Sequence, residues 1–253
     1  MASSSEDFDL TLIFPAYNEA ATILGTIQEA LKYLEETQHL RTEIIVAADG
    51  DDGTRERVRG WAKDDARIQV CGHEQRLGKG RAVREAVELA RGALIGYADA
   101  DNKVPIDEFA KVRGCFDATG CDIVCGSRAI AGSVIERYQP LYRRIGSKGF
   151  HVLMRTATGL WHVSDSQCGF KFMRREVARE IFGLQKIDGY MFDVEILVLA
   201  KRLGYDVREV PIRWRDDGDS RLEVIRGNLR NMRDIMRIRW YWSRRPGRRQ
   251  GSS

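Results

Sequence analysis

The chain has 253 residues, of which 43% are hydrophobic, and its formal net charge at neutral pH is +4. This length supports one large α/β domain or two small ones, and no uncharged apolar stretch approaches the roughly 20 residues that cross a bilayer. The N-terminus lacks the basic start and apolar core of a signal peptide. Five scattered cysteines without a Cys-x-x-Cys pair favour reduced thiols in a cytosolic protein and disfavour a zinc site.

Strand and helix patterns alternate along the first half of the chain. We expect strands at 10–14, 43–48, 67–71, 93–97 and 121–126, and helices at 20–38, 53–65, 80–91 and 105–118. In the less regular second half we expect helices at 139–158, 174–182, 192–203 and 222–241 and strands at 168–173 and 206–214. This order predicts an α/β fold with a mainly parallel sheet and helices on both faces.

No internal repeat or long linker divides the chain, so we expect a single main domain. Its predicted bounds are 9–220, followed by a basic amphipathic helix at 221–243, with disordered ends at 1–8 and 244–253.

The strand expected at 93–97 is followed by Ala98-Asp99-Ala100-Asp101. A short uncharged run of this kind is typical of a strand inside a parallel sheet, and open α/β sheets bind ligands where such strands end. Two carboxylates one residue apart repel each other unless a cation lies between them, and hard divalent cations prefer oxygen ligands. Asp99 and Asp101 therefore indicate a Mg²⁺ or Mn²⁺ site for a diphosphate, although an isolated D-x-D is more often a solvated acidic turn.

The loops after the first two strands carry further polar groups. The first loop is Pro15-Ala16-Tyr17-Asn18-Glu19, in which the proline is expected to end the strand and the last three residues supply an aromatic face, an amide and a carboxylate. The second loop contains Asp49, Asp51 and Asp52. Helix capping explains either loop without a ligand, but three carboxylates exceed what capping needs.

A third loop, Leu77-Gly78-Lys79-Gly80, opens the helix expected at 80–91. Backbone N–H groups at a helix start, together with the charge of Lys79, suit phosphate oxygens. The sequence is not a Walker A loop, because Gly80 stands where Ser or Thr would bind magnesium. No G-x-G-x-x-G follows the first strand, which disfavours a dinucleotide-binding domain.

In this order the loops resemble the nucleotide-sugar domain of the family 2 inverting glycosyltransferases. Pro15 to Glu19 matches the family's opening P-x-Y-N-E, and Asp99-Ala100-Asp101 matches its D-x-D. In the second half, Gly126-Ser127-Arg128, the DSQCGFK string from Asp165 to Lys171 and Phe192-Asp193-Val194-Glu195 resemble polyprenyl-phosphate sugar transferases. These are the dolichyl-phosphate glucosyl- and mannosyltransferases, and the strings are most similar to the glucosyl branch.

The resemblance implies a GT-A fold and metal-dependent inverting transfer of a hexose from a nucleotide sugar, with UDP-glucose favoured, to a polyprenyl phosphate. The residues that it implies for donor binding are Pro15, Ala16, Tyr17, Asn18, Glu19, Asp49, Asp51, Lys79, Asp99, Ala100 and Asp101. Asp99 and Asp101 would hold Mg²⁺ or Mn²⁺. The implied catalytic residues are Asp101, Arg128, Asp193 and Arg221.

A phosphate monoester acceptor is largely dianionic at neutral pH, so it needs a cation to hold it more than a base to activate it. The candidates are Arg128, Arg213, Arg215 and Arg221. Asp193 and Glu195 lie two residues apart on one expected helix and do not share a face, so at most one of them points into the site. Outside catalysis, it would pair with one of these arginines.

Two departures from the family pattern leave alternatives open. Ala47-Ala48 precede Asp49-Gly50 where the family usually has two adjacent acids and Gly-Ser, so Asp49, Asp51 and Asp52 all remain candidates for the base contact. Relatives commonly carry membrane-spanning helices, whereas this chain shows none. The acceptor could therefore be a soluble phosphorylated or hydroxylated small molecule, or the chain a non-catalytic nucleotide-sugar-binding subunit.

The segment 222–240 combines an apolar stripe with arginines. The stripe consists of Leu222, Ile225, Leu229, Met232, Met236 and Trp240, beside Arg226, Arg230, Arg233 and Arg237. This pattern suits the plane of an anionic membrane surface, and it equally suits a helix that packs on its own domain. The first alternative predicts a cytoplasmic protein held peripherally on the cytoplasmic membrane face. We expect no nucleic-acid partner, because no nucleic-acid motif accompanies the arginines.

Overall fold

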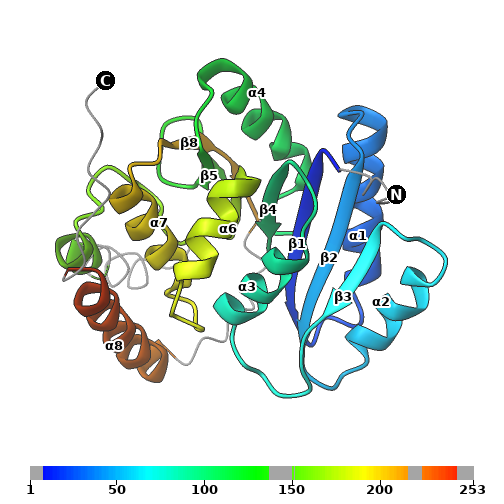
Figure 1. Cartoon of the computed structure of the whole chain (residues 1–253), viewed down its shortest axis with the longest axis horizontal. Helices are drawn as coiled ribbons and strands as arrows, with labels where there is room; N and C mark the ends of the chain where they lie inside the picture. Colours follow the sequence, from blue (N-terminus) through cyan, green and yellow to red (C-terminus); the bar gives the residue numbers. More distant parts are fainter. Residues whose placement is uncertain (1–7, 137–149, 151, 216–223, 244–253) are drawn as a thin grey trace, which may run out of the picture.

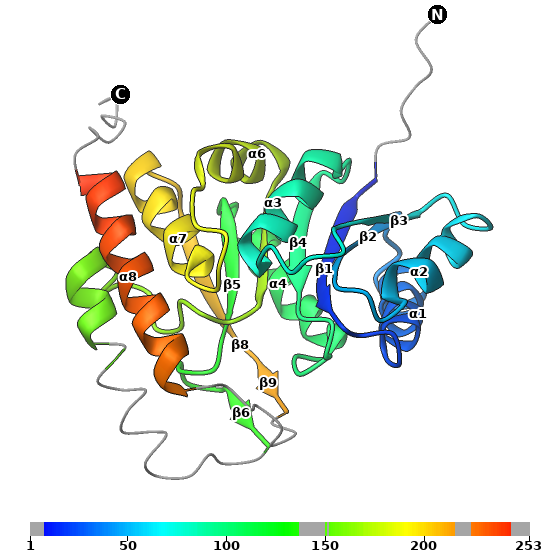
Figure 2. The ribbon, with the colours of Figure 1, turned by 90° about the horizontal axis from the view of Figure 1, so that it is seen from below.

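A computed structural model describes residues 8–136, 150, 152–215 and 224–243 of the chain. Within these residues, seven strands form a central sheet in the order β3-β2-β1-β4-β7-β5-β8 (Figure 1). The strands of the sheet are β1 (Leu10–Tyr17), β2 (Thr42–Asp49), β3 (Ile68–Cys71), β4 (Leu94–Ala98), β5 (Ile123–Ser127), β7 (Phe170–Arg174) and β8 (Val207–Pro211). Two short parallel strands, β6 (Val134–Ile135) and β9 (Arg213–Trp214), stand apart from it (Figure 2).

The helices follow the alternation expected from the sequence, with ends shifted by a few residues. They are α1 (Ile23–Lys32), continued by a π-helix η1 (Tyr33–Thr37), α2 (Thr54–Ala62), α3 (Lys79–Leu89), a 3-10 helix η2 (Ile106–Glu108), α4 (Phe109–Thr119), α6 (Arg175–Leu184), α7 (Phe192–Leu203) and α8 (Val224–Ser243). The helix expected at 139–158 is described only at 150 and 152–158, where it is helical. The expected disordered ends lie outside the described residues, except Phe8, which is buried and not disordered.

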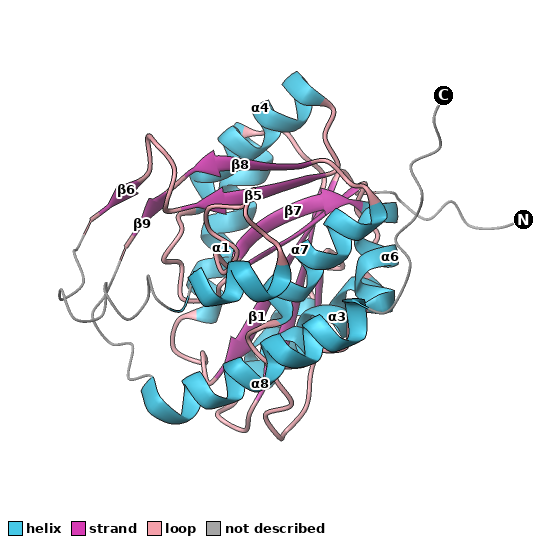
Figure 3. Ribbon diagram, turned by 90° about the vertical axis from the view of Figure 1, so that its left-hand side faces the viewer, coloured by secondary structure: helices cyan, strands magenta, loops and turns pink. Residues whose placement is uncertain are grey.

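Helices cover both faces of the sheet, as the sequence predicts. On one face α3, α6, α7 and α8 pack around buried residues such as Ile13, Tyr97 and Phe182. Figure 3 shows these helices gathered on one side. On the other face α1, α2 and α4 pack around Leu12 and Phe109. Apolar residues on both faces of β1 and β2 explain their nearly continuous apolar sequence, which is typical of buried parallel strands.

The sheet is mostly parallel, with one exception that matters for the site. Neighbouring strands among β1, β2, β3 and β4 pair in parallel, as do β5 and β8, whereas β7 runs antiparallel to both β4 and β5. The start of β7 therefore lies at the edge where β4 and β5 end. Residues 165–169 are thereby brought beside the D-x-D loop.

The first strand is longer than expected, and Pro15 does not end it. β1 continues to Tyr17, and Pro15 lies opposite Ala47 of β2. Pairing between β1 and β4 stops at Ile13, before the proline. A proline is tolerated in a strand where its missing N–H is not needed by a neighbour.

A fully buried ion pair joins β7 to α7 beneath the carboxyl edge. Lys171 Nζ lies 2.6 Å from Asp193 Oδ1 and 2.6 Å from the carbonyl oxygen of Cys168, and the Tyr97 hydroxyl donates to the same Asp193 oxygen at 2.6 Å. Burial acts to lower the pKa of Lys171, but the Asp193 carboxylate raises it above its ordinary value. The lysine therefore stays charged at neutral pH.

We predict that Lys171→Met lowers the free energy of unfolding by about 3–5 kcal/mol, because it leaves the Asp193 carboxylate buried without its counter-ion. The double variant K171M/D193L removes both charges and should recover most of that loss. Urea unfolding of the native, single and double variants measures this. Arg59→Met is the control, since its half-exposed pair with Glu56 contributes little. A double variant no more stable than K171M would contradict the assignment.

Candidate active site

A cavity of about 490 Å³ opens at the carboxyl edge of the sheet. Its walls come from the ends of β1, β2, β4 and β5, the start of α3, and the segment before β7. Most residues predicted from the sequence line it, namely Pro15, Ala16, Tyr17, Glu19, Asp49, Lys79, Asp99, Ala100, Asp101 and Arg128. The parallel topology thus brings together side chains that lie more than 100 residues apart in the sequence, as expected for loops that follow parallel strands.

Each carboxylate of the D-x-D motif is paired with a lysine. Asp99 forms an ion pair with Lys79, and Asp101 lies 2.8 Å from Lys103 Nζ. Both aspartate side chains keep a substantial exposure, 41% and 36%, so each still presents oxygen to the cavity. Gly169 makes room for Asp99, because a Cβ at this position would lie 2.2 Å from an Asp99 oxygen. Gly169 of the DSQCGFK string therefore leaves the space that the Asp99 carboxylate occupies.

The charges at this edge fit a divalent cation that arrives with a phosphate ligand. Burial raises the pKa of Glu19, and the nearby carboxylates of Asp101 and Asp52 act in the same direction. Within the described ranges, no three His, Cys, Asp or Glu side chains gather into a ready metal-binding group. Mg²⁺ is commonly held by one or two carboxylates and completed by substrate phosphates and water. Asp99 and Asp101 supply that kind of partial ligand set.

Aromatic rings and an arginine form the part of the cavity beside β1. The Arg76 guanidinium lies 4.2 Å from the centre of the Tyr17 ring and donates a 2.8 Å hydrogen bond to the Tyr190 hydroxyl. Tyr17 is 43% exposed, so much of its ring remains open to a ligand. A flat base can stack on such a ring, with the guanidinium beside it.

The acidic loop after β2 contributes one residue to the cavity. Asp49 is buried and accepts hydrogen bonds from the backbone N–H groups of His73, Leu77 and Gly78 at 3.2, 2.8 and 3.3 Å. Asp52 instead binds the start of α2 and the Ala20 N–H. Asp51 is exposed and does not line the cavity. Of the three acids, Asp49 alone lies at the cavity, and its oxygens already hold the following loop.

The glycine turn before α3 works differently from the phosphate cradle expected from its sequence. The N–H groups of Gly80 and Arg81 donate to the Asp188 carbonyl oxygen at 2.8 and 3.3 Å, while those of Leu77 and Gly78 donate to Asp49. A Cβ on Gly78 would lie 2.3 Å from that same Asp188 oxygen. The glycines therefore allow the turn to pack against residues 188–189. Lys79 remains the group that could meet a phosphate.

Arg128 is held in the cavity wall by a partner that the sequence did not reveal. Its Nε and one terminal nitrogen lie 2.6 and 2.9 Å from the two oxygens of Asp165, and its guanidinium lies 5.4 Å from the centre of the Trp214 ring. Although burial acts to raise it, the pKa of Asp165 is lowered by the hydrogen bonds and charge of Arg128. This two-pronged pair fixes the guanidinium plane at the cavity.

Several other predicted residues lie elsewhere. Asp193 does not line the cavity and pairs with Lys171, not with an arginine as expected. Arg213 pairs with Asp107 and Glu108, and Arg215 lies 3.4 Å from Glu136. The sequence did not reveal these partners, because they come from distant segments; they are Lys171, Asp107, Glu108 and Glu136.

Arg221 lies outside the described residues. Asn18 has a positive φ of 59°, and its side chain lies against Gly50, where a Cβ would be 2.4 Å from its Oδ1. It positions the loop and does not line the cavity.

Sequence reasoning missed several lining residues, which are Arg76, Lys103, Tyr190, Trp214 and Asn231. Lys103 had a usable signal, since it follows Asp101 by two residues. Tyr190 and Asn231 had none, because they reach the cavity from segments that pack against it only in the folded chain.

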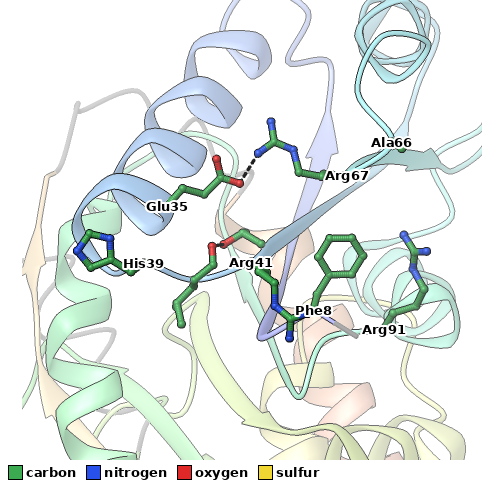
Figure 4. A pocket seen from close by; sticks show the side chains of 9 residues that line it. Phe8, Glu35, His39, Arg41, Ala66, Arg67 and Arg91 are labelled. Carbon is green, nitrogen blue, oxygen red and sulfur yellow. Dashed lines mark hydrogen bonds and ion pairs between the residues drawn. The ribbon is translucent and has the colours of Figure 1, made fainter. Parts of the chain in front are cut away.

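A second, larger cavity of about 640 Å³ lies at the opposite edge, where β1, β2 and β3 begin (Figure 4). Its arginines are matched by acids of the protein: Arg41 by Asp9, Arg67 by Glu35 and Asp65, and Arg91 by Glu43. Figure 4 shows the Arg67–Glu35 pair and the Arg91 guanidinium beside the Phe8 ring.

Comparisons with known proteins identify the family of the chain. The family model described as glycosyl transferase family 2 matches residues 11–182. A dolichyl-phosphate beta-glucosyltransferase of Trichomonas vaginalis is 36% identical over 92% of this chain and 71% of its own length. One of Dictyostelium discoideum is 32% identical, over 91% of this chain and 74% of its own.

Solved structures show the same fold. Glucosyl-3-phosphoglycerate synthase from Mycobacterium tuberculosis, in complex with Mn²⁺, UDP-glucose and phosphoglyceric acid, has a TM-score of 0.64 at 19% identity. That similarity covers 92% of this chain and 79% of the other. The chain therefore belongs to glycosyl transferase family 2 and is a glycosyltransferase with the GT-A fold.

Proposed function

We propose that the chain transfers glucose from UDP-glucose to a polyprenyl phosphate of the dolichyl type, with inversion at the sugar and with Mg²⁺ or Mn²⁺. The observation that carries the proposal is the convergence of Asp99, Asp101 and Arg128 on the cavity that also holds Tyr17. The names of the relatives, dolichyl-phosphate beta-glucosyltransferases, support this acceptor and this sugar.

The residues divide the cavity into three tasks. Tyr17 and Arg76 would hold the base, and Asp49 fixes the loop beside them. Asp99 and Asp101 would hold the metal ion, which when bound supplies positive charge to the leaving diphosphate. Lys79 lies close enough to Asp99 to meet the same diphosphate. Arg128 would face the acceptor phosphate, oriented by Asp165.

No side chain in this scheme has to act as a strong base. The acceptor phosphate is already largely dianionic at neutral pH, so its oxygen can attack the sugar carbon directly. The arginine's task is to bind and orient that oxygen, and a planar guanidinium held by Asp165 suits a phosphate.

Our first prediction for this function concerns Asp101. Incubation with UDP-[¹⁴C]glucose, polyprenyl phosphate and Mn²⁺ should give a labelled lipid, and Asp101→Asn should lower the rate about 100-fold or more, equivalent to ~3 kcal/mol, because charge stabilisation of the leaving group is lost. Asp64→Asn, which removes an exposed carboxylate after α2, is the matched control and should leave the rate unchanged.

The same assay tests the alternatives. Labelled lipid formed at the native rate by D101N, or in excess chelator, would overturn the metal assignment. Faster transfer from GDP-mannose than from UDP-glucose would overturn the sugar. Transfer only to a soluble phosphorylated acceptor would overturn the lipid.

We also propose that α8 attaches the enzyme peripherally to the cytoplasmic membrane face. Along the described part of α8, Ile235, Ile238 and Trp242 are buried against the domain, whereas Leu229 and Trp240 are 71% and 55% exposed. The helical segment at 152–158 lies beside α8 (Figures 1 and 2). Val152 and Leu153 of this segment and Met236 of α8 are exposed as well.

The sequence left two roles open for this helix, packing on the domain and contact with a membrane surface. The exposure pattern of α8 is compatible with both, each on a different side of the helix. One side packs on the domain and the other presents apolar groups to a membrane interface. No described helix is both long enough and apolar enough to cross a bilayer.

We predict that L229S/M236S/W240S weakens binding to liposomes by about tenfold or more, because three apolar side chains no longer enter the interface. Flotation with liposomes measures the binding. The control L89S/V134S removes exposed apolar groups at other places and should float like the native chain. Equal flotation of the native chain and the triple variant would refute the membrane role of this face.

A further inference from the structure

A third cavity, of about 330 Å³, lies between α8, the turn before α3 and residues 188–190. It is next to the cavity at the carboxyl edge, which we call the donor cavity, and the two share Arg76, Gly78, Lys79 and Tyr190. Asn231 of α8 lines the donor cavity, whereas Arg230 and Arg233 line this one. We call it the α8 cavity.

Positive charge exceeds negative charge in its lining. The cations are Arg76, Lys79, Arg230, Arg233 and Arg237, and the acids are Asp188 and Asp234. Both acids are already matched: Asp188 lies 2.7 Å from Arg84, which is outside the cavity lining, and Asp234 lies 3.4 Å from Arg237. Lys79 is matched by Asp99.

Arg230 and Arg233 differ from the other cations of this lining: among the residues that the structure describes, no carboxylate lies within ion-pairing distance of either guanidinium. They stand three residues apart on α8, so they share one face of the helix. Arg76 reaches the same hollow from the other wall, with a tyrosine hydroxyl and a tyrosine ring as its contacts. Three guanidinium groups around one hollow repel each other unless an anion joins them.

We propose that the α8 cavity binds a phosphate-bearing anion through Arg230, Arg233 and Arg76. The planar fork of arginine matches phosphate oxygens, and a hollow of this size accommodates a phosphate group with its substituent. The site adjoins the donor cavity and shares Arg76 with it, but Asp99 and Asp101, which contribute negative charge to the donor cavity, do not line it.

The phosphate could be a lipid headgroup or a free phosphate. Leu229 and Met236, on the same helix as the arginines, are exposed. If α8 lies in the interface as proposed above, the cavity mouth is near the headgroups, and the lipid source therefore rests on that proposed function. The free-phosphate source does not.

The test uses the full chain and the double variant R230Q/R233Q. The matched control is R57Q/R59Q, which removes two exposed arginines from α2. One arm measures flotation with phosphatidylcholine vesicles containing phosphatidylserine, and the other measures inorganic phosphate binding by calorimetry. Neither arm needs donor, metal or sugar transfer, so a failure here is distinguishable from a failure of the proposed reaction.

We expect R230Q/R233Q to lose about 30-fold in affinity and the control to lose little, since each arginine near an anionic surface contributes roughly a fivefold factor. A selective loss for the vesicles identifies a headgroup site, and a selective loss for inorganic phosphate identifies a free-phosphate site. Equal affinities of the two variants in both arms would overturn the proposal. Melting curves of both variants should match the native curve and show that neither is unfolded.

Discussion

The ion pair between Lys79 and Asp99 is the interaction on which the donor cavity depends. It joins the first residue of α3 to the loop after β4, at the centre of the carboxyl edge. Burial acts to lower the pKa of Lys79, but the charge of Asp99 raises it well above its ordinary value, so the lysine remains protonated at neutral pH. Because the two charges offset each other, both side chains can lie in a recessed site before any ligand binds. With donor bound, Asp99 would hold the metal ion and the Lys79 ammonium would meet a phosphate oxygen.

The motifs of the second half support this edge from below and from the side. Asp193 holds Lys171 under the cavity, while Glu195 accepts the N–H groups of Lys186 and Ile187 and the Trp242 indole N–H. Burial raises the pKa of Glu195, so its hydrogen bonds do not fully offset the loss of water. The F-D-V-E string thus fastens β7, the 186–190 segment and α8 to one helix. Asp193 and Glu195 therefore hold in place segments that form the walls of the donor cavity and the α8 cavity, although neither residue lines either cavity.

The sequence predicted the elements and most of the cavity lining because local patterns locate the strand ends, and parallel strands bring those ends to one edge. The sequence did not predict the role of a residue whose partner lies far away along the chain. Gly78 is explained by its close approach to Asp188, Gly80 by its close approach to Ile187, and the position of Arg128 by Asp165. On α8, apolar residues recur on more than one side. Spacing alone did not separate the packed Ile235 and Ile238 from the exposed Leu229 and Met236.

We propose that Asp99 and Asp101 form half of a metal site that a nucleoside diphosphate completes. Titration of Mn²⁺ followed by electron paramagnetic resonance, with and without UDP, measures whether the diphosphate supplies the other half. We expect weak Mn²⁺ binding by the protein alone and binding at least about tenfold tighter when UDP is present, because phosphate oxygens supply the missing ligands. Mn²⁺ affinity that is the same with and without UDP would contradict it.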